Sequence, residues 1–317
     1  MATKLNVYEM VTDRILAELE KGNIPWHKPW IRPTCTTTYS NVKVEVDPKT
    51  CAYSRSTGRP YSLLNQMLLC RSGEWATYKQ IQEAGGQVRK GEKSSIVVFW
   101  KFIETKKVNA KGEEETERIP MLKYYNVFHV ETQVDNLKPK ARRVTETISV
   151  PTGKTKSEFE WEAIEAADEV VRAYLAHSGV THADEEGDRA FYRPSTDSII
   201  TPARGQFKDP AEYYSTLFHE ITHSTGHHSR LDRFRETGSH AFGSDNYSKE
   251  ELVAELGASA MLNFLGIENK ATFRNSTAYI QNWAQHIKAD TKLIVHASGK
   301  AEKAVNYILS GELPAHA

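Results

Sequence analysis

The stretch His219-Glu220-Ile221-Thr222-His223 decides which fold is expected for the second half of this 317-residue chain. On an α-helix, residues four apart lie on one face, so His219 and His223 point the same way and can bind one metal ion. Zinc is the usual metal at such a pair. Glu220 lies beside the two histidines and is the candidate catalytic residue, a general base that takes a proton from water activated by the metal.

The flanking residues indicate that this stretch is a helix. Asp209 is a candidate N-cap, Pro210 occupies the first helical position, and Gly226 follows the second histidine as a stop signal. Apolar residues at helical spacing predict one buried face: Tyr213, Tyr214, Leu217, Phe218 and Ile221. We therefore expect a helix that begins at Pro210, buries its apolar face and carries the metal ligands on another.

A third protein ligand is expected downstream, because a catalytic zinc site takes three protein ligands and leaves the fourth position open. Residues 248–258 predict a second helix on which Glu251 and Glu255 share a face. We expect Glu251 to be the third ligand and Glu255 to orient a ligating histidine. Ser248 and Glu251 also fit a capping box, and in that alternative Glu255 is the ligand. Two histidines and a glutamate favour Zn²⁺, with Mn²⁺ as the second candidate.

Length and composition predict a globular protein of two domains. The chain is 39% hydrophobic and 26% charged, and no apolar run approaches the ~20 residues needed to span a bilayer. Residues 1–20 carry acids and lack an apolar core segment, so we expect no secretory signal. Cys35, Cys51 and Cys70 are odd in number and show no metal-ligand spacing, which is typical of reduced thiols. We expect a cytoplasmic protein with no membrane partner.

Charge is divided unequally between the two halves, although the net charge is zero. Residues 1–156 hold 26 Lys and Arg against 17 Asp and Glu, a balance of +9. Residues 157–317 hold 15 against 24, a balance of −9. A basic half indicates a polyanionic partner, while the competing interpretation is that its charges form only a solvated face.

Aromatic residues are interleaved with basic residues through the first half, a mixture that suits single-stranded nucleic acid. In the stiff segment 24–30, Trp26 and Trp30 flank Lys28, and the two rings either stack on bases or pack in the core. The candidate nucleic-acid-binding residues are Trp26, Lys28, Trp30, Arg59, Trp75, Lys79, Arg89, Lys90 and Lys93.

The predicted elements give an α+β fold with two domains. Residues 1–135 are expected to form an α+β domain with a small antiparallel sheet. Residues 136–156 contain prolines and basic residues and are expected to be a linker. Residues 157–317 are expected to form a mostly helical domain that carries the metal site.

Within these domains, the patterns predict specific elements. The expected helices are 8–21, 62–70, 77–84, 157–177, 277–287 and 301–310. The sheet is expected to contain strands at 96–102 and 122–130, joined by an exposed hairpin loop. A second hairpin of 190–193 and 198–201 is the candidate for aligning a peptide substrate beside the metal helix.

Several longer motifs, taken together, resemble the ArdC family of plasmid and phage antirestriction proteins. In the first half these are Ile24-Pro25-Trp26-His27-Lys28-Pro29-Trp30, Gly58-Arg59-Pro60-Tyr61, the Trp75-to-Gln80 stretch, Gly85-Gly86-Gln87-Val88-Arg89-Lys90-Gly91-Glu92-Lys93 and Tyr125-Asn126-Val127-Phe128. In the second half they are the stretch from Tyr214 to His223 and Glu250-Glu251-Leu252-Val253-Ala254-Glu255. The resemblance covers the whole chain.

The resemblance implies an N-terminal domain that binds single-stranded DNA and a C-terminal zincin-like metallopeptidase domain. It further implies a role in protecting transferred DNA from host restriction. The chain is similar to gluzincins as well, which supports Glu251 as the ligand and Glu255 behind it. Two hypotheses follow: a DNA-tethered zinc peptidase that cleaves an unidentified protein, or a DNA-shielding protein whose metal site is structural or vestigial.

Overall fold

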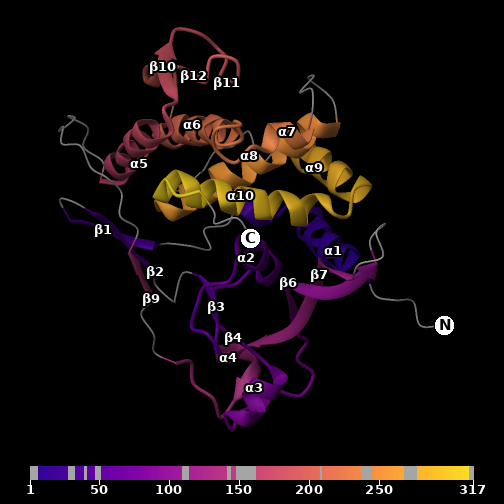
Figure 1. Ribbon diagram of the computed structural model, residues 1–317. Coiled ribbons are helices and arrows are strands. Elements are labelled where there is room, and N and C mark those ends of the chain that lie inside the picture. Colours follow the sequence, from indigo (N-terminus) through magenta and orange to yellow (C-terminus); the bar gives the residue numbers. More distant parts are fainter. Residues whose placement is uncertain are drawn as a thin grey trace.

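The computed structural model describes residues 6–27, 33–38, 41–46, 51–108, 114–140, 144–147, 162–207, 209–237, 245–267 and 277–313. The fold is α+β, as predicted, with most strands in the first half of the chain and most helices in the second (Figure 1).

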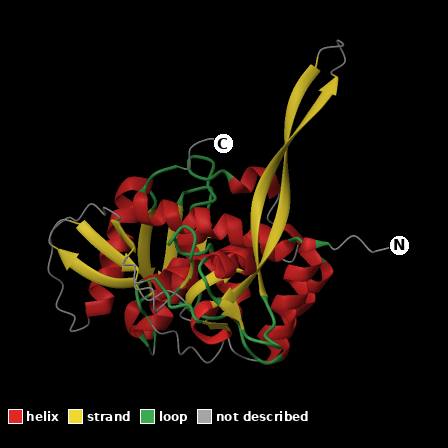
Figure 2. Ribbon diagram, turned by 90° about the horizontal axis from the view of Figure 1, so that it is seen from below, coloured by secondary structure: helices red, strands yellow, loops and turns green. Residues whose placement is uncertain are grey.

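The first half is built around a four-stranded sheet with the order β3-β4-β7-β6. Its strands are β3 (Ala52–Ser54), β4 (Gly73–Thr77), β6 (Ser95–Val108) and β7 (Glu114–His129). The last two pair antiparallel along their length and project from the body as a long ribbon (Figure 2). The predicted strands 96–102 and 122–130 lie within this ribbon, apart from the last residue. It is longer than predicted because backbone pairing continues through the charged residues beyond Phe102.

The helices of the first half are α1 (Val7–Glu20), η1 (Pro25–His27), α2 (Leu63–Leu69), α3 (Tyr78–Glu83) and α4 (Val130–Gln133). Helix α3 begins at a capping box in which Thr77 and Gln80 each bond the other's backbone N–H. Trp75, two residues before the predicted helix 77–84, lies in β4, a strand that was not predicted, opposite His129 of β7.

Two smaller sheets complete the first half. One has the order β1-β2-β9, with β1 (Pro33–Thr38), β2 (Asn41–Val46) and β9 (Val144–Thr147), and the other pairs β5 (Gln87–Val88) with β8 (Val134–Asp135). Strand β9 lies inside the stretch predicted as a linker. That stretch therefore contains a strand, because its residues 144–147 pair antiparallel with β2.

The second half is mostly helical. Its helices are α5 (Glu162–Ser178), η2 (Arg204–Gln206), α6 (Pro210–Ser224), α7 (Arg233–Thr237), α8 (Asp245–Phe264), α9 (Thr277–Ala289) and α10 (Leu293–Ser310). A sheet of order β10-β12-β11 lies beside α6, with β10 (Thr181–Glu185), β11 (Phe191–Arg193) and β12 (Ser198–Pro202). The predicted hairpin is confirmed as β11 and β12, while β10, which pairs parallel with β12, was not predicted.

One hydrophobic core joins the two halves. It contains buried residues of α1, α2, β6 and β7 together with residues of α8, α9 and α10, such as Leu252 and Ile294. A second core lies between α5, α6, α8 and α10. Helix α8 is thus buried on both sides, against the first half and against α6. Among the described helices, none is long and apolar enough to cross a membrane.

Candidate metal centre

Helix α6 begins and is buried as its sequence predicts. The Asp209 side chain accepts a hydrogen bond from the Ala211 N–H (2.8 Å), and Pro210 occupies the first turn. The buried side chains of the helix, Tyr214, Leu217 and Ile221 among them, pack in the second core. This packing leaves the rings of His219 and His223 on the side that faces α8.

Helix α8 lies very close to α6 because Gly257 has no side chain. A Cβ atom added there would lie 2.5 Å from Cγ2 and 2.7 Å from Oγ1 of Thr222. Thr222 is fully buried and its hydroxyl donates to the Phe218 carbonyl (2.7 Å), so it has no room to move away. This contact point, inside the His-Glu-x-x-His stretch, sets how closely the α8 carboxylates approach the histidines.

Three candidate ligand groups meet between the helices: His219, His223 and Glu251. The two Nε2 atoms are 3.1 Å apart, and the Glu251 oxygens lie 3.4 Å from His219 Nε2 and 3.3 Å from His223 Nε2. Tetrahedral bonds of ~2.0–2.1 Å place neighbouring ligand atoms about 3.3–3.4 Å apart. The donor set, two imidazoles and a carboxylate, also suits zinc or manganese. The residues present therefore fit a divalent metal ion.

The start of α8 removes the capping-box alternative for Glu251. The helix begins at Asp245, so Ser248 lies within its first turn instead of at its N-cap. Both oxygens of Glu251 face the histidines, whereas the Glu255 carboxylate lies on the other side of His219, with Oε2 3.9 Å from Nδ1. Glu251 thus lies among the candidate ligand groups and Glu255 lies behind His219, while their roles as ligand and supporting residue stay predictions.

A second carboxylate contact was not predicted from the sequence. Glu250 Oε1 lies 3.7 Å from His223 Nδ1, and Glu250 accepts hydrogen bonds from Arg233 Nε (3.2 Å) and Nη2 (2.6 Å). Arg233 is buried and also donates to the Thr222 carbonyl (2.8 Å) and the Thr225 hydroxyl (2.7 Å). No sequence signal pairs Arg233 with Glu250, because their pairing depends on how the chain returns from α6 to α8.

The carboxylates dominate the electrostatics of the centre. Burial disfavours a charged imidazole at His223, but Glu250 and Glu251 outweigh it and raise the pKa of His223 to about 10. Burial likewise opposes ionisation of Glu250, yet Arg233 and His223 lower its pKa to about 2. The pKa of Glu251 is also lowered, against burial, by His219 and His223. The carboxylates therefore favour a positive charge at the point where His219, His223 and Glu251 meet, which a bound cation would supply.

Comparisons with known proteins agree with both halves of this description. Residues 5–128 match the N-terminal domain of anti-restriction factor ArdC, and residues 169–300 match a zincin-like metallopeptidase family. Crystal structures of the antirestriction protein ArdC from plasmid R388, metal-free and Mn(II)-bound, superpose with a TM-score of 0.65. They are 34% and 33% identical and cover 96% of this chain and 97% of theirs. The chain belongs to the ArdC antirestriction family.

Other relatives of this ArdC-family chain differ in length. Two proteins named DNA primase TraC from Escherichia coli are 35% identical over 98% and 96% of the chain. The chain spans only 20% and 27% of their length. A protein from Sinorhizobium fredii, y4eC, described as uncharacterized, is 30% identical over 96% of the chain and 92% of its own length.

Two of the nucleic-acid candidates in the ArdC N-terminal domain are corrected by burial. Trp26 is 1% exposed and Trp75 is 3% exposed, so neither ring has a face open to a base. The core alternative holds for Trp26, which packs in the core that α8 shares with the first half. Trp75 packs under the sheet with Val97 and Val127. Lys28 and Trp30 lie outside the described residues.

The remaining basic candidates all have exposed side chains, and all except Arg59 belong to the stretch from α3 to β6. They are Lys79, Arg89, Lys90 and Lys93, while Arg59 lies in the turn that follows β3. Arg89 is committed to protein contacts: Nε donates to Asp135 (2.7 Å) and Nη1 to the Thr132 carbonyl (2.8 Å). A role in DNA binding stays a prediction for all five.

A stacked pair of rings on the ribbon, one partly buried and one exposed, was not predicted from the sequence. Phe99 and Tyr125 stack with centroids 4.7 Å apart and planes 8° from parallel, and Tyr125 is 56% exposed. Lys123 pairs with Phe99 across the ribbon, and Lys101 is the next residue on that face. We call these four residues the ribbon platform. The sequence pattern that could have revealed the platform is the alternation of a strand, which places residues 97, 99 and 101 on one face.

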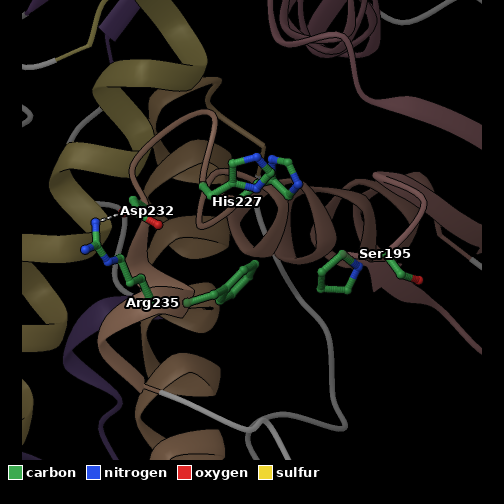
Figure 3. A pocket seen from close by; sticks show the side chains of 7 residues that line it. Ser195, His227, Asp232 and Arg235 are labelled. Carbon is green, nitrogen blue, oxygen red and sulfur yellow. Dashed lines mark ion pairs between the residues drawn. The ribbon is translucent and has the colours of Figure 1, made fainter.

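A surface depression of about 750 Å³ lies at the C-terminal end of the metal helix (Figure 3). Its lining residues are Pro194, Ser195, His227, His228, Asp232, Phe234 and Arg235. The first two form part of the turn between β11 and β12, the hairpin that was predicted to align a peptide. The Phe234 ring packs against the backbone of Gly226 near the helix end, where an added Cβ would lie 2.8 Å from the ring.

Proposed function

We propose that this chain is a metal-dependent peptidase joined to a single-stranded-DNA-binding module, and that it protects transferred DNA. The observation that carries the peptidase assignment is the arrangement of His219, His223 and Glu251 at distances that fit one divalent ion, with Glu220 on the same helix. Zn²⁺ is the metal we propose, and Mn²⁺ is the alternative, which is bound by the R388 relative.

The proposed chemistry divides the work between the ion and the protein. A bound ion of this kind polarises a peptide carbonyl and lowers the pKa of water. His219, His223 and Glu251 would hold the ion, and Glu220 would accept the proton from the attacking water and pass it to the leaving amine. The depression beside the β11–β12 turn is the proposed place for a substrate side chain, because it adjoins the hairpin that we expect to align an extended peptide.

The decisive variant is Glu220→Gln, which keeps the volume of the side chain and removes its basicity. We expect full metal content and a loss of cleavage of roughly 10²- to 10⁴-fold, the usual contribution of general base catalysis. Cleavage would be measured on fluorescein-labelled casein, with and without single-stranded DNA. Metal retention with unchanged cleavage would exclude Glu220 as the base.

Glu251→Gln and Glu255→Gln separate the proposed ligand from its neighbour. Loss of one of three protein ligands should abolish stoichiometric metal binding in Glu251→Gln, whereas Glu255→Gln should weaken binding by roughly 10- to 100-fold. The reverse order would identify Glu255 as the ligand. Metal content measured by mass spectrometry of the purified protein reads out both variants.

The ribbon platform carries the second part of the proposal. Its two stacked rings and two lysines combine a surface for bases with positive charge for phosphates, which is how single strands are bound without sequence preference. The balance of +9 in residues 1–156, from 26 basic and 17 acidic residues, supports a polyanion on this half.

The competing function is DNA shielding without proteolysis. It shares the DNA surface and differs only at the metal centre, so the Glu220→Gln variant distinguishes the two in cells. If transferred DNA loses its protection from restriction in that variant, proteolysis is required. Protection at the wild-type level would support shielding alone.

A further inference from the structure

The short helix η1 brings the first half of the chain to the metal helix pair. Trp26 is buried in the core that contains Leu252 and Leu256 of α8, and the Asn263 amide of α8 donates to the Trp26 carbonyl at 3.4 Å. The ring of His27 stacks on Tyr279 of α9, with centroids 6.0 Å apart and planes 23° from parallel. The position of His27 is therefore fixed by contacts with two helices of the second half.

From this position His27 reaches the carboxylate behind the first candidate ligand. His27 Nε2 lies 3.0 Å from Glu255 Oε1, and the side chains are 12% and 5% exposed. The other carboxylate oxygen, Oε2, lies 3.9 Å from Nδ1 of His219. That Nδ1 is buried and makes no hydrogen bond among the described residues. Glu255 thus lies between a histidine of the first half and a candidate metal ligand of the second.

We propose that His27 is a positioning residue of the metal centre, contributed by the N-terminal half of the chain. Its Nε2–H donates to Glu255 Oε1 and holds the carboxylate so that Oε2 faces His219 Nδ1. An N–H on Nδ1 leaves Nε2 as the metal-binding nitrogen and sets the plane of the ring. This inference rests on the proposed metal site and adds that the metallopeptidase half does not complete that site by itself.

The arrangement favours this role over simple packing. A histidine that only filled space against Tyr279 would not need its far nitrogen within hydrogen-bonding distance of a buried carboxylate. Buried carboxylates require partners, because an unpaired charge away from water is costly. On the other face of His219, Glu251 already meets both Nε2 atoms, so the Nδ1 side of the ring is the side that Glu255 can orient.

The test compares variants of the full-length protein whose side chains at position 27 differ in whether they can donate a hydrogen bond to Glu255. His27→Gln places an amide N–H close to the position of Nε2, while His27→Asn is polar but ends one bond short and His27→Phe keeps only the ring. We expect near wild-type affinity for Zn²⁺ and Mn²⁺ in His27→Gln and a loss of roughly 10- to 100-fold in the other two. Titration calorimetry with each metal alone provides the measurement, and circular dichroism confirms folding.

His296→Phe is the matched control. His296 of α10 also contacts the first half, where its ring stacks on Trp100 with centroids 6.5 Å apart, and it is not among the residues grouped at the metal centre. It should bind metal like the wild type. The double variant His27→Asn with Glu255→Gln should bind no more weakly than Glu255→Gln alone, since His27 acts through that carboxylate.

The outcomes separate the inference from the function on which it rests. Normal metal affinity in His27→Asn and His27→Phe, with the wild type binding one ion, would overturn the positioning role and leave the metal site standing. Equal losses in the Gln, Asn and Phe variants would show that the imidazole packs without positioning Glu255. A wild type that binds neither metal would overturn both proposals.

Discussion

Gly257 shows how a residue outside the chemistry sets the geometry of the candidate metal centre. Its missing side chain lets α8 lie against Thr222 of the metal helix. Glu255 and Glu251, which face the histidines, lie two and six residues before Gly257 on the same helix. A larger residue at position 257 would push α8 away from α6 and move Glu251 away from the histidines, because packed helices move as rigid units. Glycine is disfavoured within helices, so its presence here reflects the required contact.

We predict that Gly257→Ala destabilises the protein and weakens metal binding. The added methyl group would overlap the buried Thr222 side chain, and overpacking of this kind costs about 1–3 kcal/mol. Gly299→Ala is the matched control, because Gly299 lies within α10 with nothing within 4 Å of an added Cβ. That change should stabilise the protein by roughly 0.5–1 kcal/mol. Urea unfolding and metal titration measure both; equal effects would contradict the packing argument.

The sequence identified the side chains that meet between α6 and α8 better than it identified the residues that support them. His219, Glu220 and His223 are recognisable because helical spacing and metal chemistry constrain them within one turn. The contact of Glu250 with Arg233 was not predictable, since it joins residues 17 apart across a change of direction. For Trp26 and Trp75, composition suggests both burial and stacking, and only packing distinguishes them.

At the scale of elements, the β6–β7 ribbon projects well beyond the helices (Figure 2). Its two faces differ. One bears the ribbon platform, and the other bears Phe102 beside Arg118, whose guanidinium carbon lies 5.1 Å from the ring centroid. Tyr125 on the first face is 56% exposed and Phe102 on the second is 50% exposed. Exposed apolar side chains that lie close together mark interaction sites, which is why we expect the ribbon to have a binding partner.

We predict that Phe99→Ala with Tyr125→Ala weakens binding of an oligothymidylate. Removal of one base-stacking ring costs about 1–3 kcal/mol, roughly 5- to 150-fold in Kd. Lys101→Gln with Lys123→Gln should lower the salt dependence of binding, by roughly 0.7 in the log–log slope for each phosphate that is no longer neutralised. Fluorescence anisotropy over a salt series measures both effects.

Phe102→Ala is the control for this prediction, because Phe102 is 50% exposed on the opposite face of the same strand. It should bind the oligonucleotide like the wild type. If it weakens binding as much as the platform variants do, the single strand runs across both faces or elsewhere on the ribbon, and the assigned platform is wrong.

Elements were predicted well where one local pattern determined them. Helix α6 has a cap, a proline and a periodic apolar face, and the structure begins it at Pro210 as predicted. Strand β4 was not predicted because its sequence runs directly into a capped helix, and its pairing with β7 involves residues about 50 positions away. The same reason applies to β9 and β10, whose partners are distant or parallel strands.

At the scale of the whole molecule, the two halves meet through α10 and α2 as well as through η1. Glu302 of α10 lies partly buried there and accepts a hydrogen bond from the backbone N–H of Leu63, the first residue of α2. Burial raises the pKa of Glu302 above its usual range, and the hydrogen bond opposes this only in part.

The raised pKa of Glu302 makes the stability of the protein depend on pH. A carboxyl group whose folded pKa is raised favours folding when protonated, and this contribution is lost as pH rises from the unfolded value of about 4.3 through the folded pKa. We predict that Glu302→Gln, which keeps an acceptor for Leu63, raises Tm at pH 8 and leaves it unchanged at pH 4. Glu312→Gln, at an exposed position after the same helix, is the control. A gain at pH 4 as large as at pH 8 would contradict the charge-burial explanation.

The shared core of the two halves has a consequence for how such a chain is inherited. Expression of either half alone would expose the apolar faces of α1 or α8 that pack in the shared core, so we expect neither half to fold well without the other. A gene fusion that keeps this fold is then expected to carry the coding sequence of both halves. The two TraC primases agree with this, since each matches nearly the whole chain within a protein several times longer. The two halves are in this sense inherited as one unit, because they share one hydrophobic core.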